Sequence, residues 1–284
     1  MSIVVTGATG NLGRHVVEQL LEKVPADQVT AVVRTPEKAA DLAARGVRIA
    51  VADYSAPETF DGLFTAGDKV LLISGSEVGD ARVAQHRTVI EAAKTAGVAL
   101  LAYTSAPGSL TAALADDHRA TEEALLASGV PYVLLRNGWY HENYTENLAP
   151  VLEHGAVTHA AGDGRVSSAA RADYAAAAVA VLTGEGHENR TYELGGDVAW
   201  SFGEYAAELS RQTGREIAEN PVSAETLTGI LAGAGVPEPF AAILAGVDTS
   251  IAKGELVIDS GDLSRLAGRP TTPLADAIAA ALKG

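Results

Sequence analysis

The chain has 284 residues, of which 47% are hydrophobic and 20% are charged, and its formal net charge at pH 7 is −15. This composition is typical of a folded globular protein and excludes a disordered chain. The acidic balance argues against nucleic-acid binding through a basic surface. The absence of cysteine excludes disulfides, thiolate nucleophiles and cysteine metal sites.

The start of the chain leads directly into an apolar, strand-like segment, with no basic start and no cleavable apolar stretch. The longest apolar runs are rich in alanine and interrupted, so no membrane-spanning segment is predicted. A cytoplasmic location is therefore expected. The sequence leaves monomer and homodimer open as the oligomeric state.

Apolar strand-like segments alternate with amphipathic helix-like segments up to residue 136. Strands are expected at 2–6, 29–33, 47–51, 69–73, 98–104 and 132–135. Helices are expected between them at 11–23, 36–44, 81–96 and 116–127. This alternation is typical of βαβ units in a parallel sheet, and the nearly continuous apolar strands indicate that both faces of the sheet are covered.

The pattern changes after Arg136. An alanine-rich helix is expected at 173–182 and one more strand at 190–194, whereas short helices separated by glycine and proline follow from Trp200. We predict an α/β protein with a doubly wound parallel sheet of the Rossmann type at 1–136. Residues 137–284 are expected to complete the sheet and to form a smaller, mainly helical C-terminal lobe that binds the substrate.

A glycine-rich turn connects the first strand to the first helix. Residues 4–13 read VVTGATGNLG. Gly7 permits a sharp turn, Gly10 lets the backbone approach a pyrophosphate, and Gly13 allows close helix–strand packing. The helix N-terminus offers free N–H groups to phosphate. The sequence therefore predicts a dinucleotide site, with contacts from Thr6, Gly7, Ala8, Thr9, Gly10, Asn11 and Leu12.

The end of the second strand distinguishes NAD from NADP. An acidic residue there would bind the ribose 2′-hydroxyl, but this chain has Arg34, with Lys38 one helical turn further on. Both cations suit a 2′-phosphate, and arginine binds phosphate bidentately. We predict NADPH as the cofactor; the alternative is an ordinary surface Arg and Lys.

Polar and small residues also follow the later strands, at the edge of the sheet where ligands bind in open α/β folds. They come after the third, fourth and fifth strands. The residues expected to contact the cofactor there are Asp53, Tyr54, Ser74, Gly75, Ser76 and Thr104.

The Tyr-x-x-x-Lys pair of short-chain dehydrogenases is absent, because none of the eight tyrosines has lysine four residues later. His118 and Glu122 lie four residues apart on one helical face, where a His–Glu pair would relay a proton. The alternative is a partly exposed helix pair. The seven histidines show no metal-binding spacing, so no metal is predicted. Without a strong general acid, quinones and triarylmethyl cations remain suitable hydride acceptors.

Several stretches together resemble the NmrA-like atypical short-chain dehydrogenase/reductase family, especially its quinone and triphenylmethane dye reductases. The resemblance spans nearly the whole chain. It rests on VTGATGNLG (5–13), LLISGSEVG (71–79), LLRNGWYHENY (134–144), AAGDGRVSSAARADYAAA (160–177) and GHENRTYEL (186–194).

The resemblance implies a flavin-free reductase that transfers hydride from NADPH to a small-molecule acceptor, a quinone or an aromatic dye. It also places the segment after the sixth strand, which includes His141 and Glu142, beside the nicotinamide and the acceptor. Contacts with the cofactor are expected from Gly138, Trp139, Tyr140 and Asn143. Tyr140, Asn143 and His118 are the candidate catalytic residues. The alternative for the aromatic side chains is that they seal the core between the lobes.

Two other functions stay open at this point. One is a regulatory protein that senses NADP(H) without turnover, as in NmrA-like regulators. The other is a reductase of a ketone or an imine, with His118 or Tyr140 as the acid.

Overall fold

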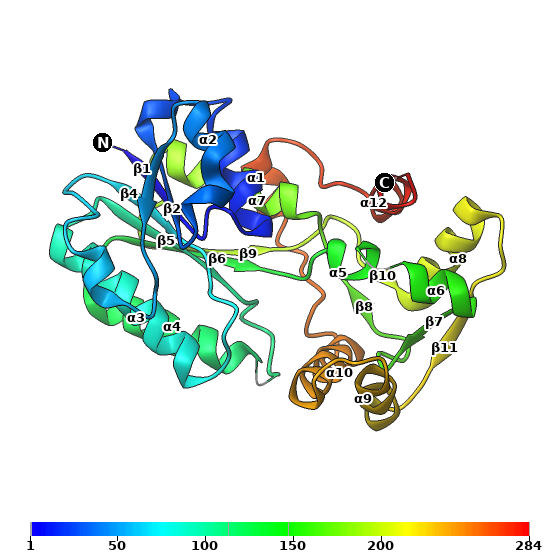
Figure 1. Cartoon of the computed structure of the whole chain (residues 1–284). Coiled ribbons are helices and arrows are strands. Elements are labelled where there is room, and N and C mark those ends of the chain that lie inside the picture. The colour runs from blue at the N-terminus through cyan, green and yellow to red at the C-terminus, as the bar shows by residue number, and fades with distance from the viewer. Residues whose placement is uncertain (1, 113, 147, 284) are drawn as a thin grey trace.

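The computed structural model describes residues 2–112, 114–146 and 148–283. Its main unit is a parallel seven-stranded sheet of order β3-β2-β1-β4-β5-β6-β9 (Figure 1). The strands are β1 (Ile3–Thr6), β2 (Val29–Val33), β3 (Arg48–Val51), β4 (Lys69–Leu72), β5 (Leu100–Ser105), β6 (Tyr132–Asn137) and β9 (Arg190–Leu194). The predicted doubly wound Rossmann sheet is confirmed. The strand order reverses between β1 and β4, where such sheets bind ligands.

Helices cover both faces of this sheet (Figure 1). Successive strand residues point to opposite faces: Val5 and Leu71 pack in one core, and Val4 and Val70 in the other. The first face is covered by α1 (Asn11–Leu20), α2 (Ala40–Ala44), α7 (Arg171–Thr183) and α11 (Asp262–Ala267). The second face is covered by α3 (Asp80–Ala96) and α4 (Leu114–Ser128).

Two expected helices are shorter than predicted. The first helix ends at Leu20, because residues 21–24 form turns. The segment 36–44 divides into the 3-10 helix η2 (Pro36–Ala39) and α2. Two further 3-10 helices, η1 (Ala26–Gln28) and η3 (Pro57–Phe60), precede β2 and β4.

A smaller lobe follows β6 and packs around an aromatic core in which Tyr144, Trp200, Phe202 and Tyr205 meet. Its helices are α5 (Glu142–Thr145), α6 (Ala149–His154), α8 (Phe202–Thr213), α9 (Ala224–Gly233), α10 (Glu238–Ala252) and α12 (Leu274–Ala281). Two small sheets pair β7 (Ala156–His159) with β11 (Ala218–Pro221) and β8 (Arg165–Val166) with β10 (Trp200–Ser201). These strands were not predicted, since two to four residues give no readable alternation.

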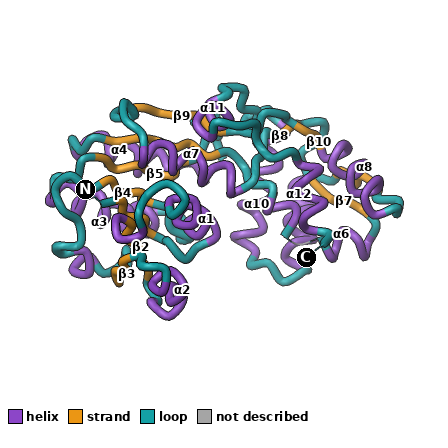
Figure 2. The backbone as a smooth tube through the Cα atoms, turned by 90° about the horizontal axis from the view of Figure 1, so that it is seen from above, coloured by secondary structure: helices purple, strands orange, loops and turns teal. Residues whose placement is uncertain are grey.

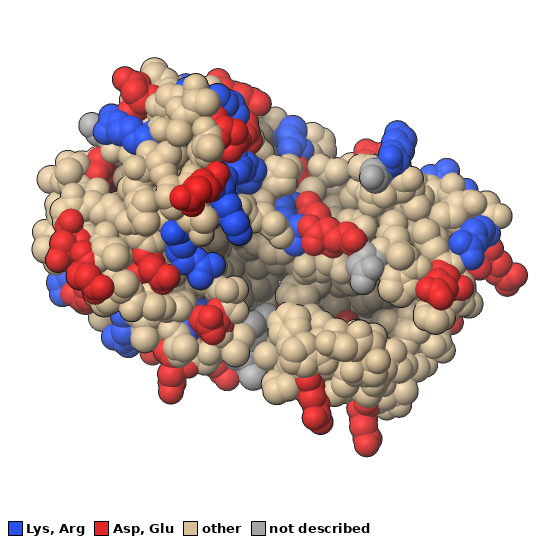
Figure 3. Space-filling model, in the orientation of Figure 1, with Lys and Arg blue, Asp and Glu red and all other residues tan. Residues whose placement is uncertain are grey.

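The lobe and the sheet lie side by side (Figure 2), although α7, β9 and α11 return from residues beyond 136 to the sheet unit. On the face shown in Figure 3 the surface is hollowed between them, and Lys and Arg side chains gather at the rim beside the sheet. No helix within residues 2–112, 114–146 and 148–283 combines the length and apolarity needed to cross a membrane.

Candidate functional site

The turn between β1 and α1 has the backbone geometry that its glycines predict. Gly7 has a φ of 61°, in the left-handed region. A Cβ on Gly13 would overlap the Gly7 carbonyl and lie 2.8 Å from the Ala8 Cα. A Cβ on Gly10 would approach only the Gly7 oxygen, at 3.2 Å, and would otherwise enter open space. Gly10 therefore leaves room for a ligand to touch the backbone.

The start of α1 has the features of an anion-binding helix N-terminus. No side chain caps this helix, and its first turn has no acidic residue. The first N–H groups of a helix have no acceptor within the helix, and the helix dipole makes this end partly positive. A pyrophosphate therefore fits here without competition from a carboxylate.

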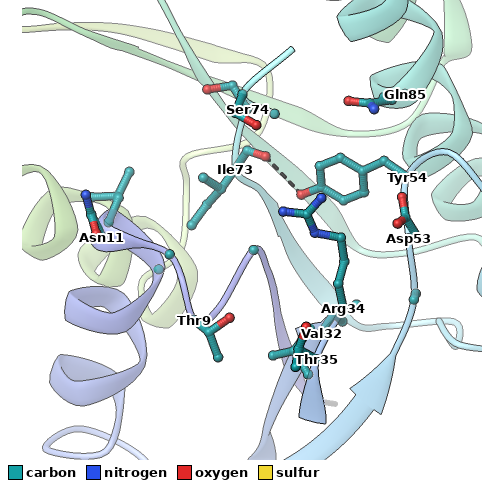
Figure 4. A pocket seen from close by; sticks show the side chains of 18 of the residues that line it. Thr9, Asn11, Val32, Arg34, Thr35, Asp53, Tyr54, Ile73, Ser74 and Gln85 are labelled. Carbon is teal, nitrogen blue, oxygen red and sulfur yellow. Dashed lines mark hydrogen bonds between the residues drawn. The ribbon is translucent and has the colours of Figure 1, made fainter. Parts of the chain in front are cut away.

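A cavity of about 400 Å³ opens in front of this turn, at the carboxyl ends of β1, β2, β3 and β4. Twelve of the residues predicted to bind the cofactor line it: Gly7, Thr9, Gly10, Asn11, Leu12, Arg34, Lys38, Asp53, Tyr54, Ser74, Gly75 and Ser76. The structure thus brings together residues from four strand ends and the glycine turn. Figure 4 shows several of these side chains around the cavity.

Two cations stand at the β2 side of the cavity. Arg34 extends from the end of β2 toward Tyr54 (Figure 4), and Lys38 follows on η2. Both side chains are exposed, and within the described part of the chain neither forms an ion pair with an acidic side chain. Their charge is therefore available to a phosphate group on the ribose.

A hydroxyl pair joins three strands at the floor of the cavity. The Thr6 and Tyr54 oxygens lie 2.5 Å apart, and the Tyr54 hydroxyl donates to the Ile73 carbonyl at 2.9 Å. Because each hydroxyl has one proton and that of Tyr54 goes to Ile73, the Thr6 hydroxyl donates to the Tyr54 oxygen, and the Thr6 oxygen also lies 3.0 Å from the Leu71 carbonyl oxygen. Burial raises the pKa of Tyr54, so its hydroxyl keeps its proton. Tyr54 is thereby held in place as a wall of the cavity.

Three predicted contacts lie behind the lining instead of in it. Thr6 and Ala8 are fully buried. The Thr104 hydroxyl oxygen accepts a hydrogen bond from the Ser74 N–H at 2.9 Å, so Thr104 supports the loop after β4.

Eight lining residues were missed by the sequence reasoning: Gly13, Val32, Val33, Thr35, Ala52, Ile73, Glu77 and Gln85. Most of these are neighbours of predicted residues at strand ends, so a wider window around each strand end would have found them. Gln85 comes from α3 and has no such signal. Its amide donates to the Ser55 hydroxyl oxygen at 2.9 Å.

The segment after β6 lies outside the cavity lining described above. A Cβ on Gly138 would lie 2.9 Å from the Leu194 oxygen and 3.0 Å from the Tyr174 hydroxyl, so packing against β9 and α7 explains this glycine. Trp139 packs on the core of the smaller lobe. Asn143 is exposed on α5.

Tyr140 packs edge-on against Tyr174, with the ring centroids 5.2 Å apart. The Arg171 guanidinium carbon lies 5.4 Å from the centre of the Tyr140 ring. Burial raises the pKa of Tyr140, which makes it a weak acid at neutral pH. Catalytic roles for Tyr140 and Asn143 stay predictions.

The hydrogen bonds of His118 and Glu122 go to other residues and do not join the two side chains. The His118 Nδ1 lies 2.8 Å from the Tyr103 hydroxyl, and burial together with the Arg82 charge lowers its pKa to about 3. Glu122 accepts hydrogen bonds from Ser105 at 2.6 Å and from Arg136 at 2.7 and 3.0 Å. The expected His–Glu relay is therefore corrected to two separate structural contacts, and a catalytic role for His118 stays a prediction.

No group of three or more His, Asp or Glu side chains in the described part of the chain is placed to hold a metal ion. The site consists of a glycine turn, a helix N-terminus and two cations. Its donors suit the phosphates of a dinucleotide.

Comparison with known proteins agrees with this geometry. A family model for NAD(P)H-binding proteins matches residues 7–185. The chain is 48% identical over 278 residues to quinone oxidoreductase 2 of Escherichia coli strain K12, and the alignment covers 97% of both chains.

Two solved structures have nearly the same fold. The NADPH complex of an NADPH-dependent quinone oxidoreductase from Escherichia coli has a TM-score of 0.95 at 47% identity, with 99% of both chains covered. The NADP(H) complex of Citrobacter sp. triphenylmethane reductase has a TM-score of 0.94 at 43% identity, with 99% of this chain and 100% of the other covered. The chain therefore belongs to the NAD(P)H-binding, NmrA-like family of oxidoreductases.

Proposed function

We propose that this protein reduces a quinone or a related conjugated acceptor, such as a triphenylmethane dye, with NADPH. The observation that carries the cofactor choice is the pair Arg34 and Lys38 at the cavity, where NAD-specific proteins have an acidic residue. The acceptor class is supported by relatives that align with this chain over nearly its full length and are named quinone oxidoreductase and triphenylmethane reductase.

The chain's own residues have defined roles in this proposal. Gly10 and the N-terminus of α1 bind the pyrophosphate, and Arg34 binds the 2′-phosphate. When bound, the reduced nicotinamide supplies the hydride. Trp139, Tyr140 and Asn143 remain the proposed neighbours of the nicotinamide and the acceptor.

The acceptor class also agrees with the acid–base groups of the site. Neither Tyr140 nor His118 is a strong acid at neutral pH. Burial raises the pKa of Tyr140, so its hydroxyl releases a proton less readily, and lowers the pKa of His118, so its ring carries no second proton to donate. Quinones stabilise the phenolate that hydride addition produces, and triarylmethyl cations become neutral. Such acceptors need correct placement more than a strong general acid.

The test is NADPH oxidation by the purified protein, followed by the loss of NADPH absorbance. A benzoquinone, a naphthoquinone and a triphenylmethane dye are compared with a reaction that lacks acceptor. We expect turnover with at least one acceptor, and much slower turnover with NADH. Tight NADPH binding without turnover would overturn the proposal and favour an NADP(H)-sensing regulator.

A further inference from the structure

The segment 74–79, between β4 and α3, forms one wall of the cofactor cavity through Ser74, Gly75, Ser76 and Glu77. It contains no helix or strand. Its backbone groups must therefore find hydrogen-bond partners outside regular secondary structure.

Four of these backbone groups are bound by side chains. The Gly75 N–H donates to His86 Nε2 at 2.9 Å, and the Gly79 N–H donates to Asp117 Oδ2 at 2.6 Å. The Ser74 N–H donates to the Thr104 hydroxyl oxygen, and the Glu77 carbonyl accepts from Arg82 Nε. The side chains that provide these contacts come from β5, α3 and α4, and all of them are buried.

The contacts of His86 fix its tautomer. Because Nε2 accepts the Gly75 N–H, the proton of the neutral ring sits on Nδ1. The Thr121 hydroxyl oxygen lies 2.9 Å from Nδ1 and donates its own proton to the Asp117 carbonyl at 2.9 Å. Each donor in this series of hydrogen bonds thus meets an acceptor.

The neutral ring is also what its surroundings favour. His86 is fully buried, and burial together with the charge of Arg82 lowers its pKa to about 3. A second proton on Nε2 would face the Gly75 N–H, so the contact exists only with the neutral ring. The Tyr103 hydroxyl lies 3.4 Å from His86 Nδ1 and 2.8 Å from His118 Nδ1, which joins His118 to the same network.

We propose that His86 is a positioning residue for NADPH, and that it acts by holding the Gly75 N–H so that the segment 74–79 keeps the shape of the cavity wall. The inference rests on the proposed function only in its choice of NADPH as the ligand. His86 does not line the cavity, so its effect passes through Gly75.

The experiment compares substitutions at buried positions on α3. His86→Leu removes the acceptor and leaves the Gly75 N–H without a partner, whereas His86→Gln places an amide oxygen near the position of Nε2. Val89→Ala is the matched control, because Val89 is buried on the same helix but packs in the apolar core. The measurement is the equilibrium Kd for NADPH, without acceptor, together with amide exchange of residues 74–79.

We expect His86→Leu to raise the Kd for NADPH about tenfold, because the half-buried Gly75 N–H loses its acceptor and the segment 74–79 loses a contact that holds its shape. Amide exchange of Gly75 should accelerate in the same variant. His86→Gln should restore most of the affinity. Val89→Ala should lower the melting temperature and leave the Kd within about twofold.

An unchanged Kd in His86→Leu, an equal loss in Val89→Ala, or no recovery in His86→Gln would each overturn the inference. If His86→Leu prevents folding, Thr121→Val tests the same series of hydrogen bonds, because it removes the partner of His86 Nδ1. It should weaken NADPH binding by about threefold, and an unchanged Kd would again refute the idea. Because no acceptor is present, failure of the quinone reaction would not affect this result.

Discussion

Arg34 determines the predicted preference for NADPH over NADH. Its exposed guanidinium reaches over the cavity from the end of β2 and forms no ion pair with an acidic side chain of the described residues. We expect Arg34→Ala to raise the Kd for NADPH at least tenfold, about 1.4 kcal/mol, and to leave NADH binding nearly unchanged. Titration of both dinucleotides into the purified variant measures this.

Arg48→Ala is the control for this experiment, because it removes an exposed arginine that does not line the cavity. Arg48→Ala should leave the Kd for NADPH and the Kd for NADH unchanged. The interpretation of Arg34 fails if the unmutated protein binds NADH more tightly than NADPH.

Gly10 tests the position of the pyrophosphate. A Cβ here would point into open space at the cavity, so a branched side chain would fill the volume that the phosphates need. We expect Gly10→Val to abolish dinucleotide binding while the protein stays folded, as measured by calorimetric titration and circular dichroism. Gly229→Val is the control, because a Cβ at this position on α9 has open space around it, and this variant should bind the dinucleotide normally. An unchanged dinucleotide affinity in Gly10→Val would show that the pyrophosphate does not bind at Gly10.

At the scale of elements, the neighbouring residues Glu142 and Asn143 of α5 differ in their contact with α7. The Arg171 N–H, at the start of α7, donates to both carboxylate oxygens of Glu142, at 2.9 and 3.1 Å. Glu142 therefore supports α7, whereas Asn143 is exposed. We expect Glu142→Ala to lower the free energy of unfolding by about 1 kcal/mol, the usual cost of losing a helix cap.

Asn143→Ala is the matched change in the same helix. Its unfolding free energy in urea should stay within about 0.5 kcal/mol of the unmutated value, as for most exposed residues. Its Kd for NADPH should rise, because the Asn143 amide is the predicted neighbour of the nicotinamide. A large stability loss with normal binding would contradict this assignment.

For the whole molecule, buried histidines make stability depend on pH. His86 and His118 have pKa values of about 3, because burial and the charge of Arg82 disfavour protonation. In the unfolded chain both take up protons near the ordinary value of about 6.5. The unfolded state therefore binds more protons between these values, so the free energy of unfolding falls as the pH falls. Asp248 opposes this, because burial raises its pKa to about 6. Burial also lowers the pKa of His141, His159 and His187, and these three groups act in the same direction as His86 and His118.

Urea unfolding at about pH 7 and about pH 5 measures this dependence, which is at most about 1.4 kcal/mol per pH unit for each histidine. His86→Gln should reduce the slope of the free energy of unfolding against pH. His15→Gln, which replaces an exposed histidine on α1, is the control. Equal slopes in the unmutated protein and His86→Gln would show that His86 is not the source.

Much of the site could be predicted because it is local in sequence. The glycine turn and the strand ends are each defined by a few consecutive residues, and the parallel topology brings strand ends to one edge of the sheet. Arg34 was found for this reason, since it directly follows a recognisable strand. Residues whose partners lie on other elements could not be placed in this way.

The sequence by itself determined the Rossmann sheet, the glycine turn and the two cations at the cavity, because hydrophobic periodicity and backbone requirements act over short stretches. Only the tertiary structure decided what the buried polar side chains do. It separated His118 from Glu122, assigned Glu142 to the start of α7, and brought His86 from α3 against the cavity wall. A hydrogen bond depends on ångström-scale placement of groups from different elements, and this placement is fixed only when the cores pack.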